Sequence, residues 1–339
     1  MSSNMQRQWQ VAARPAGRPL LDDDFQLALV EVASPAVGEV LVRTAYLGFD
    51  PAQKSWMENA ASYMNPVEIG GVMPGSGAGV VVESQHPDFE PGDTVFGPLG
   101  WQELATVPGR LLYKTPAGVP LEAVLSVLGG TGRTAYLALM KVGKPVAGDT
   151  LLISGAAGAT GSLVGQIGKI AGCRVIGIAG GPEKCAWLTG ELGFDAAIDY
   201  KNEKLRTRLR ELAPAGVDIF FDNIGGEILN DALARLAPRA RVVICGGISR
   251  YNFDPRSQEM PSGPRNYFNV VFTGATIQGF LMPEYERDYP EADTRLEAWV
   301  RAGRIKARPD VLDGFENAPD ALMRLFDGRN VGKQLLKIS

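Results

Sequence analysis

The chain has 339 residues, of which 45% are hydrophobic and 21% are charged, and its formal net charge is −4. A chain of this length usually divides into two domains, and its composition is that of an ordinary globular protein. The negative charge argues against a nucleic-acid partner, because phosphate binding requires a clustered basic face. No run reaches the roughly 18 apolar residues of a membrane helix, so we expect no membrane partner.

Targeting and redox signals point to the cytoplasm. The N-terminal residues contain no apolar segment of the signal-peptide kind. The three cysteines, Cys173, Cys185 and Cys245, show no CxxC spacing. An odd number of scattered cysteines is typical of free thiols in a reducing compartment. We therefore expect a cytoplasmic protein.

The first part of the chain, residues 1–128, consists of short β-type runs separated by Gly and Pro. Examples are EVLVRTAYLGF (39–49), GAGVVVES (77–84) and DTVFGPLG (93–100). This pattern predicts a β-rich domain. The C-terminal residues 327–339 also form a strand pattern that returns to this domain. The domain is therefore expected to be discontinuous, with 310–339 as its second part.

Residues 129–309 follow a different pattern, in which buried strands alternate with helices. DTLLISGAAG (149–158) is a strand, and the amphipathic helix 158–172 follows it. The alternation continues with strand 174–181, helix 182–193, the segments 195–200, 217–226, 228–238, 241–249 and 276–282, and a helix over 298–305. Strands that are apolar throughout, with helices between them, predict an α/β fold with a doubly wound parallel sheet of the Rossmann type.

A glycine-rich turn, SGAAGATG (154–161), lies between the first of these strands and its helix. Such a turn presents backbone amides and the positive end of the helix dipole to a pyrophosphate. Gly158 lets the backbone approach the phosphates, and Gly161 lets the helix pack against the strand. Ala156 replaces the first glycine of the usual pattern, and a tight strand-to-helix connection is the structural alternative. Within a complete βαβ unit the turn predicts a dinucleotide site.

The end of the second strand indicates which dinucleotide binds. Enzymes that use NAD place an Asp or Glu there for the ribose hydroxyls, whereas this chain has Ala179, Gly180 and Gly181. The two glycines leave space for a 2′-phosphate, and Lys184 in the next helical turn can neutralise it. Lys184 taken alone could also be an ordinary surface lysine. Together these features favour NADP(H).

Several catalytic classes are excluded by what the sequence lacks. The single histidine, His86, lies in the polar turn ESQHPDFEPGD and is expected at the surface. One histidine and three scattered cysteines cannot supply the usual zinc ligand sets, so we expect no zinc. Catalysis by Ser-His-Asp or Cys-His would need that loop histidine as its base. The YxxxK pair of short-chain dehydrogenases does not follow the glycine turn. Hydride transfer remains, because the cofactor carries its chemistry.

The motifs in combination resemble those of a known family. The chain is similar to the zinc-free prostaglandin and alkenal reductase branch (NADPH-dependent alkenal/one oxidoreductases) of the medium-chain dehydrogenase/reductase superfamily, from residue 41 to the C-terminus. Matching segments are YLGFDP (46–51), SYMNPVEIG (62–70), GDTVFG (92–97), GWQELA (100–105), GRTAYLAL (132–139), AAGATGSLVGQIGKIAGCRVIG (156–177), DNIGGE (222–227), ICGGISRYN (244–252) and GRNVGK (328–333).

The resemblance implies a GroES-like substrate domain formed by 1–128 and 310–339, an NADP-binding Rossmann domain at 129–309, and a homodimer joined along strands of the cofactor domain. It also implies a set of cofactor contacts. Gly158, Ala159, Thr160 and Gly161 would hold the pyrophosphate; Lys184 and Tyr200 would meet the 2′-phosphate and ribose side; Asn223, Cys245, Gly246, Gly247, Ile248, Ser249 and Tyr251 would line the adenine and the nicotinamide ribose; Phe280, Leu281 and Met282 would flank the nicotinamide; and Asn330 would reach the cofactor from the tail.

One segment departs from the family pattern. Many members read DPYMR after the first long strand, whereas this chain has DPAQK, with Ala52 in place of the aromatic residue. Any substrate role of that aromatic cannot be transferred. Tyr63, in the loop 52–66 that would border the substrate together with segment 250–270, is the candidate hydrogen-bond donor. An aromatic side chain packed under a loop is its structural alternative.

The implied reaction is NADPH-dependent reduction of the carbon–carbon double bond of an α,β-unsaturated aldehyde or ketone. Hydride would add to the β-carbon, and hydrogen bonds would stabilise the resulting enolate. Two alternatives stay open at this point: an NADPH quinone oxidoreductase of the same superfamily, and a non-catalytic NADPH-binding sensor.

Overall fold

The chain divides into two compact units. The computed structural model describes residues 5–58, 64–65, 67–253 and 263–338. The first unit, here called the β-rich unit, contains residues up to Gly129, Asn252 with Phe253, and the residues from Pro309 onward; the second, the α/β unit, contains Gly130–Tyr251 and the described residues up to Arg308. Each is described below by itself.

The α/β unit is built on a parallel sheet of six described strands in the order β10-β9-β8-β11-β12-β13. Its strands are β8 (Thr150–Ile153), β9 (Arg174–Ala179), β10 (Ala196–Asp199), β11 (Val217–Asp222), β12 (Leu236–Ile244) and β13 (Thr276–Gly279). The chain runs outward from β8 to β10 and then returns to place β11 beside β8. Ligands of open α/β sheets bind at such a reversal, beyond the carboxyl ends of the strands.

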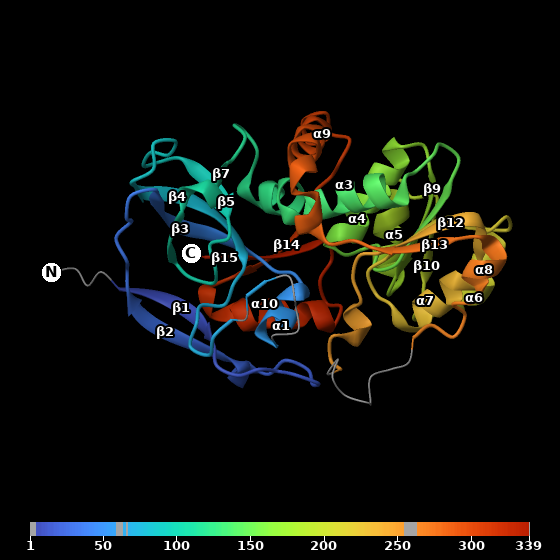
Figure 1. Ribbon diagram of the computed structural model, residues 1–339, viewed down its shortest axis with the longest axis horizontal. Helices are drawn as coiled ribbons and strands as arrows, with labels where there is room; N and C mark the ends of the chain where they lie inside the picture. Colours follow the sequence, from blue (N-terminus) through green and yellow to red (C-terminus); the bar gives the residue numbers. More distant parts are fainter. Residues whose placement is uncertain (1–4, 59–63, 66, 254–262, 339) are drawn as a thin grey trace. The chain divides into compact units, whose positions relative to one another are not determined.

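Helices cover both faces of this sheet (Figure 1). They are α3 (Gly130–Leu137), α4 (Ala159–Ile170), α5 (Pro182–Gly190), α6 (Leu205–Leu212), α7 (Gly226–Leu233), α8 (Asn269–Thr273) and α9 (Tyr289–Arg301). Helix α4 packs on β8 and β9 and against α3, whereas α6 and α7 contact each other and pack on β10 and β11. Ile176, Ile178, Phe220 and Val242 lie fully buried between the layers. The predicted α/β fold with a doubly wound parallel sheet is therefore confirmed.

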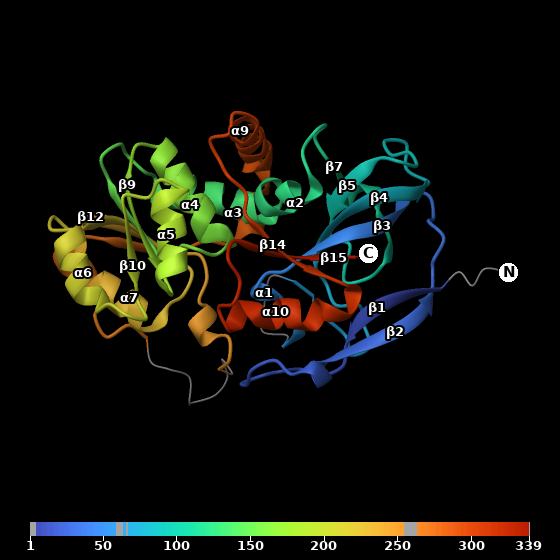
Figure 2. The same ribbon diagram turned by 180° about the vertical axis from the view of Figure 1, so that it is seen from behind.

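The β-rich unit contains a sheet in the order β14-β15-β3-β4-β5-β7, with β6 also paired to β3, and a separate β1–β2 hairpin. Its elements are β1 (Met5–Val11), β2 (Phe25–Glu31), β3 (Glu39–Gly48), α1 (Ala52–Met57), β4 (Ser76–Ser84), β5 (Thr94–Gly97), β6 (Leu104–Pro108), β7 (Tyr113–Lys114), α2 (Leu121–Ala123), β14 (Pro309–Asp313), α10 (Ala318–Phe326) and β15 (Lys333–Lys337). Strand β15 lies antiparallel beside β3, with Leu335 opposite Gly48 (Figure 2). The C-terminal segment thus completes a sheet that the N-terminal residues begin.

The helix predicted over 298–305 was wrong at both ends, because α9 spans Tyr289–Arg301. Pro290 occupies the first turn, where a missing N–H leaves no hydrogen bond unmade. Gly303 adopts a left-handed φ of +65° just after the helix, and glycine at this place commonly ends a helix. Ile305 is 4% exposed beyond that end, so its apolar character reflects the core and not a continuing helix.

One described helical run, Leu121–Gly143, is long and apolar enough to cross a membrane by length and composition, with a mean hydropathy of 1.2. The expectation that no run of this kind exists was wrong in that respect. However, 78% of the apolar stretch is buried inside the protein. This is the burial of a core helix, whose apolar side chains are already covered by protein.

Candidate functional site

The glycine-rich turn brings the start of α4 close to β8. A Cβ at Gly161 would stand 2.4 Å from the carbonyl oxygen of Gly155, so that only glycine fits there, and a Cβ at Gly158 would stand 3.2 Å from the same oxygen. The first hydrogen bond of α4 is donated by Ser162 to Gly158. The amides of the residues between them lie in the first turn, where an α-helix offers no partner. The turn is therefore a cradle for an anionic group at a helix N-terminus.

A buried polar knot joins the ends of β8 and β11 beside this turn. The hydroxyl of Ser154 donates to a carboxylate oxygen of Asp222 over 2.7 Å, and the amide of Asn223 donates back to the hydroxyl oxygen over 2.8 Å. The side-chain amide of Asn223 donates to the Ser154 carbonyl. Burial raises the pKa of Asp222, while hydrogen bonds from Ser154, Gly225 and Ile224 act in the opposite direction. The knot fixes Asn223 at the switch point of the sheet.

The segment after β12 lies against the residues that follow β11. The amides of Cys245 and Gly246 both donate to the carbonyl of Asp222, at 2.9 and 3.1 Å. A Cβ at Gly246 would stand 3.2 Å from the carbonyl oxygen of Asn223, and the Ser249 hydroxyl donates to the Ile224 carbonyl. The structure thus brings most of the predicted ribose-binding residues together in one place.

The other residues of the segment after β12 form a short helical turn. Gly247 caps the short helical turn Ile248–Arg250, after which Tyr251 donates its amide to the Ile248 carbonyl. Burial raises the pKa of the Cys245 thiol to about 12. This thiol therefore stays protonated near neutral pH and is unsuited to act as a nucleophile. In the Cys245–Tyr251 segment, Cys245 therefore serves as a small apolar side chain.

At the end of β9 the structure forms a ledge, defined here as Gly180 and Gly181 with the side chains that border them. A Cβ at Gly180 would stand 3.0 Å from both Tyr200 Cε1 and Lys201 Cε. The space that an acidic side chain would fill in an NAD enzyme is thus occupied by Tyr200 and Lys201. Lys184 follows in the first turn of α5, where it is partly exposed. Lys201 was missed by the sequence reasoning, although it directly follows Tyr200.

A carboxylate holds this ledge in shape. Asp199 accepts hydrogen bonds from the amides of Gly181 and Lys201, at 2.8 and 3.1 Å, and from the side chain of Asn202. The bond from Asn202, followed by the one from Gly181, lowers the pKa of Asp199. This acid lies one strand away from the position used in NAD enzymes, and backbone amides already engage it. The neighbouring Tyr200 ring remains about half exposed, at 47%.

The strip Phe280–Met282 continues from β13 past the end of β12. The amide of Phe280 donates to the Ile244 carbonyl over 3.0 Å, and its ring stacks on Tyr285 with centroids 4.9 Å apart. Leu281 lies between Phe280 and Met282 in extended conformation. Because Ile244 directly precedes the Cys245 segment, the predicted nicotinamide strip and the predicted ribose segment lie beside each other.

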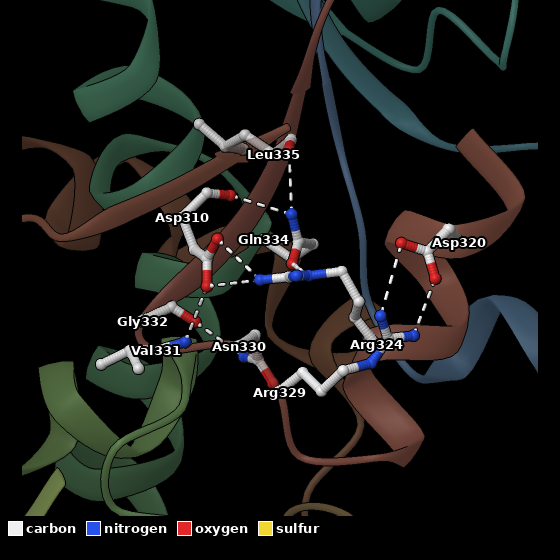
Figure 3. A network of polar contacts seen from close by, with 9 residues as sticks. All are labelled: Asp310, Asp320, Arg324, Arg329, Asn330, Val331, Gly332, Gln334 and Leu335. Atoms are coloured by element: carbon white, nitrogen blue, oxygen red, sulfur yellow. Dashed lines mark hydrogen bonds and ion pairs between the residues drawn. The ribbon is translucent and has the colours of Figure 1, made fainter. Parts of the chain in front are cut away.

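In the β-rich unit, the loop that carries Asn330 is held by a polar network (Figure 3). The side chain of Asp310 accepts the amide of Val331 over 3.0 Å and pairs with Arg324 at 3.0 and 3.1 Å. Arg324 also donates to Gln334, whose amide nitrogen returns a hydrogen bond to the Asp310 carbonyl. The side chain of Asn330 donates to the Gly332 carbonyl. The loop is thus ordered by its own unit.

In the same unit, ion pairs hold the residues around α1. Lys333, whose side chain is 2% exposed, pairs with Asp50 over 2.6 Å. Pro51 separates Asp50 from α1, and Lys54 of α1 forms a further buried ion pair with Glu58, the residue that follows the helix. Tyr63 itself lies outside the described residues. Its role as a hydrogen-bond donor stays a prediction.

The comparisons with known proteins were made on the whole chain. Residues 7–115 match the family described as N-terminal domain of oxidoreductase, and residues 159–298 match the family described as zinc-binding dehydrogenase. The NADPH-dependent curcumin reductase of Escherichia coli is 39% identical over 98% of this chain and 97% of its own length. Prostaglandin reductase 1 of Bos taurus is 37% identical over 98% of this chain and 98% of its own length. The chain belongs to the prostaglandin and alkenal reductase branch of the medium-chain dehydrogenase/reductase superfamily.

Solved structures of this superfamily share the fold. The crystal structure of CurA from Vibrio vulnificus in complex with NADPH matches with a TM-score of 0.90 and 38% identity, over 98% of this chain and 99% of that one. A quinone oxidoreductase of Pseudomonas syringae matches with a TM-score of 0.80 at 24% identity. At that identity the likeness is one of fold alone. The predicted membership of the medium-chain superfamily is confirmed.

The name of one matching family raises the question of zinc. In the residues that the structure describes, no three His, Cys, Asp or Glu side chains lie together in a way that could hold a metal ion. His86 lies in the predicted turn, but its side chain is only 19% exposed, because its ring packs against Gly109 and Phe89. It is therefore less exposed than expected. The absence of zinc from this medium-chain oxidoreductase stays a prediction.

Proposed function

We propose that this medium-chain oxidoreductase uses NADPH to reduce the carbon–carbon double bond of α,β-unsaturated aldehydes and ketones. The observation that carries the cofactor choice is the ledge at the end of β9, where Tyr200 and Lys201 border Gly180. The names of the relatives agree with this choice. They include the NADPH-dependent curcumin reductase and a 2-alkenal reductase (NADP(+)-dependent) of Nicotiana tabacum, which is 38% identical over 89% of this chain.

The residues present fit a phosphorylated dinucleotide. The Gly158–Gly161 turn offers first-turn amides of α4 to the pyrophosphate, and close packing requires Gly161. Lys184, in the first turn of α5 after Gly181, and Lys201, which borders Gly180, would supply positive charge for a 2′-phosphate. The Asn223 knot and the Cys245–Tyr251 run would line the ribose groups. The strip Phe280–Met282 would lie against the nicotinamide.

When bound, NADPH would supply the hydride for the β-carbon of the substrate, and the π electron pair of the double bond would shift toward the carbonyl oxygen. The contribution of the chain is to hold the reacting carbon and to stabilise that oxygen with a hydrogen-bond donor. Tyr63 is our candidate donor. A proton is then added at the α-carbon, so that the product is the saturated aldehyde or ketone. The two carboxylates described at the candidate site serve structure, because Asp222 and Asp199 accept hydrogen bonds from backbone amides.

A substrate panel tests the proposal. Initial rates of NADPH oxidation would be compared for a 2-alkenal, an enone and a benzoquinone at matched concentrations. We expect higher kcat/KM values for the alkenal and the enone. A preference for the quinone would identify a quinone reductase on the same fold. Tight binding of NADPH without turnover of any member would identify a sensor.

The donor assignment requires its own variant. Tyr63→Phe should lower kcat by about 10²–10³-fold, the effect of removing one oxyanion donor, with little change in the NADPH dissociation constant. His86→Ala is the matched control, because His86 lies in a turn of the β-rich unit, packed on Gly109. A fully active Tyr63→Phe enzyme would show that the donor is another group and leave the hydride-transfer proposal standing.

A further inference from the structure

The strip Phe280–Met282 is held at its two ends by different contacts. Phe280 is fixed by its amide bond to Ile244 and by the stacking of its ring on Tyr285. Met282 is fixed by its carbonyl, which accepts a hydrogen bond from the Tyr289 hydroxyl over 3.1 Å. Tyr289 is the first residue of α9. The amide of Glu284 also donates to the Leu281 carbonyl over 3.1 Å, and the Tyr289 hydroxyl adds a side-chain contact from α9 at this end of the strip.

Arg133 of α3 determines the place of the Tyr289 ring. The guanidinium carbon of Arg133 lies 4.7 Å from the centroid of the Tyr289 ring. Arg133 is only 5% exposed. The same guanidinium donates two hydrogen bonds of 2.7 Å to the carboxylate of Asp293, one turn further along α9. A paired, planar guanidinium in this setting has little freedom to rotate. The ring of Tyr289 is consequently stacked on a fixed surface.

Helix α3 meets the strip at a second point. A Cβ at Gly130, the first residue of α3, would stand 3.9 Å from the sulfur of Met282, so the Met282 side chain lies beside the start of that helix. The two helices α3 and α9 are neighbours in the α/β unit (Figure 1). Helix α3 thus lies directly beside the Met282 side chain. It also acts on the Met282 carbonyl indirectly, because Arg133 of α3 holds the ring of Tyr289, whose hydroxyl donates to that carbonyl.

We propose that Tyr289, stacked on Arg133, is a positioning residue for hydride transfer, because its hydroxyl fixes the carbonyl of Met282 and with it the strip that flanks the nicotinamide. This inference rests on the proposed function, which assigns Phe280–Met282 to the nicotinamide. The residue touches neither cofactor nor substrate in this account. Its effect passes through the backbone of the strip, and small errors in the placement of reacting groups are costly in rate.

The test is Tyr289→Phe, which removes the hydroxyl and keeps the ring on Arg133. The matched control is Tyr136→Phe, which removes a phenol hydroxyl from the same pair of helices, where it donates to Glu291 over 2.7 Å. We expect Tyr289→Phe to slow single-turnover oxidation of NADPH by about tenfold, since misplacement of the reacting groups weakens near-attack geometry. The KM for NADPH should stay within about twofold of wild type, because the 2′-phosphate ledge is untouched. Tyr136→Phe should leave the rate unchanged.

A second readout does not depend on turnover. The fluorescence lifetime of bound NADPH reports how tightly the nicotinamide is held, and it should change in Tyr289→Phe and remain at the wild-type value in Tyr136→Phe. Equal rates and equal lifetimes in the two variants would overturn the proposal, as would a lower melting temperature of Tyr289→Phe with an unchanged lifetime. A wild-type enzyme that binds NADPH but reduces no enone would contradict the proposed function. The lifetime difference would still test the role of Tyr289 in that case.

The link through Arg133 is tested by a double-variant cycle. Arg133→Met should lengthen single-turnover times, because the Tyr289 ring loses its stacking surface. If both residues act on Met282 through the same hydrogen bond, the Arg133→Met/Tyr289→Phe enzyme should be no slower than the slower single variant. Rates that fall by the product of the two single effects would show that Arg133 acts independently, and would contradict this part of the proposal.

Discussion

Individual glycines carry much of the cofactor assignment. Gly161 and Gly158 lie where the sequence placed them, and the structure shows why a larger side chain cannot replace Gly161. Gly180 and Gly181 were predicted to leave space for a 2′-phosphate, and the family resemblance implied Tyr200 beside it. The absence of the acid used by NAD enzymes can be seen in the sequence alone. Lys201 was missed, because it reaches Gly180 only through the pairing of β9 with the neighbouring strand β10.

The ledge predicts how the enzyme chooses between cofactors. Lys184→Ala and Lys201→Ala should each raise the KM for NADPH by about tenfold, since a hydrogen bond to a charged group contributes roughly 1.5–3 kcal/mol. Neither should change the value for NADH, which lacks the 2′-phosphate. Steady-state kinetics with NADPH and with NADH measure these KM values. Lys204→Ala, at the residue directly before α6, serves as a control for a general loss of positive charge. A wild-type enzyme that prefers NADH would contradict the assignment.

Among the elements, the positions of the buried strands were predicted more accurately than the ends of the helices. The apolar runs of β8, β9, β11 and β12 are visible in sequence because strands of a parallel sheet are buried on both faces. The β1–β2 hairpin was missed, since it forms a separate two-stranded sheet in which four of the seven residues of β2 are exposed. The Ser154–Asp222 knot was also missed. An aspartate at the end of a buried strand and a serine directly after the neighbouring strand were the available signal.

The ion pair between Lys333 of β15 and Asp50 predicts an asymmetric loss of stability. Asp50→Asn leaves the ammonium of Lys333, whose side chain is 2% exposed, buried and without its acidic partner. Lys333→Met leaves the Asp50 carboxylate, which is 41% exposed, in contact with water. Asp50→Asn should therefore cost more, up to about 3 kcal/mol, because an unpaired buried charge is the expensive product. Urea unfolding of both variants measures the difference, and an equal or reversed order would count against this account of the pair.

At the scale of the whole molecule, the α/β unit has an edge strand, β13, whose one neighbour among the described strands is β12. β13 ends the sheet order, and its residues are exposed. Beside it, α8 and the residues before it expose apolar side chains, with Val271 at 65% and Phe272 at 77%. An exposed edge strand next to apolar surface is a template for pairing with another chain. We therefore propose a homodimer in which two copies of this edge meet.

Light scattering with size-exclusion chromatography tests the dimer. Ile277→Lys places a charge on β13, and Phe272→Glu places one on α8. Both should shift the mass toward that of a monomer, whereas Val146→Glu should not. Val146 is an apolar position before β8 whose exposure of 63% lies between those of Ile277 and Phe272. A wild-type protein that is monomeric at all concentrations would rule the proposed interface out.

Independence from zinc is a further property of the whole protein. Dialysis against a strong chelator should leave both activity and melting temperature unchanged, because no closed set of ligands exists among the described residues to contribute folding energy. Elemental analysis of the purified protein provides the control. Zinc at one equivalent per chain would contradict the prediction.

The central claim, hydride transfer from NADPH to the β-carbon of an enone, is tested most directly with labelled cofactor. NADPH that carries deuterium on the transferring face of C4 would be incubated with an α,β-unsaturated ketone, and the product would be examined by NMR. We expect deuterium at the β-carbon of a saturated ketone, with a proton from solvent at the α-carbon. Deuterium at the carbonyl carbon, in an alcohol product that keeps its double bond, would contradict it.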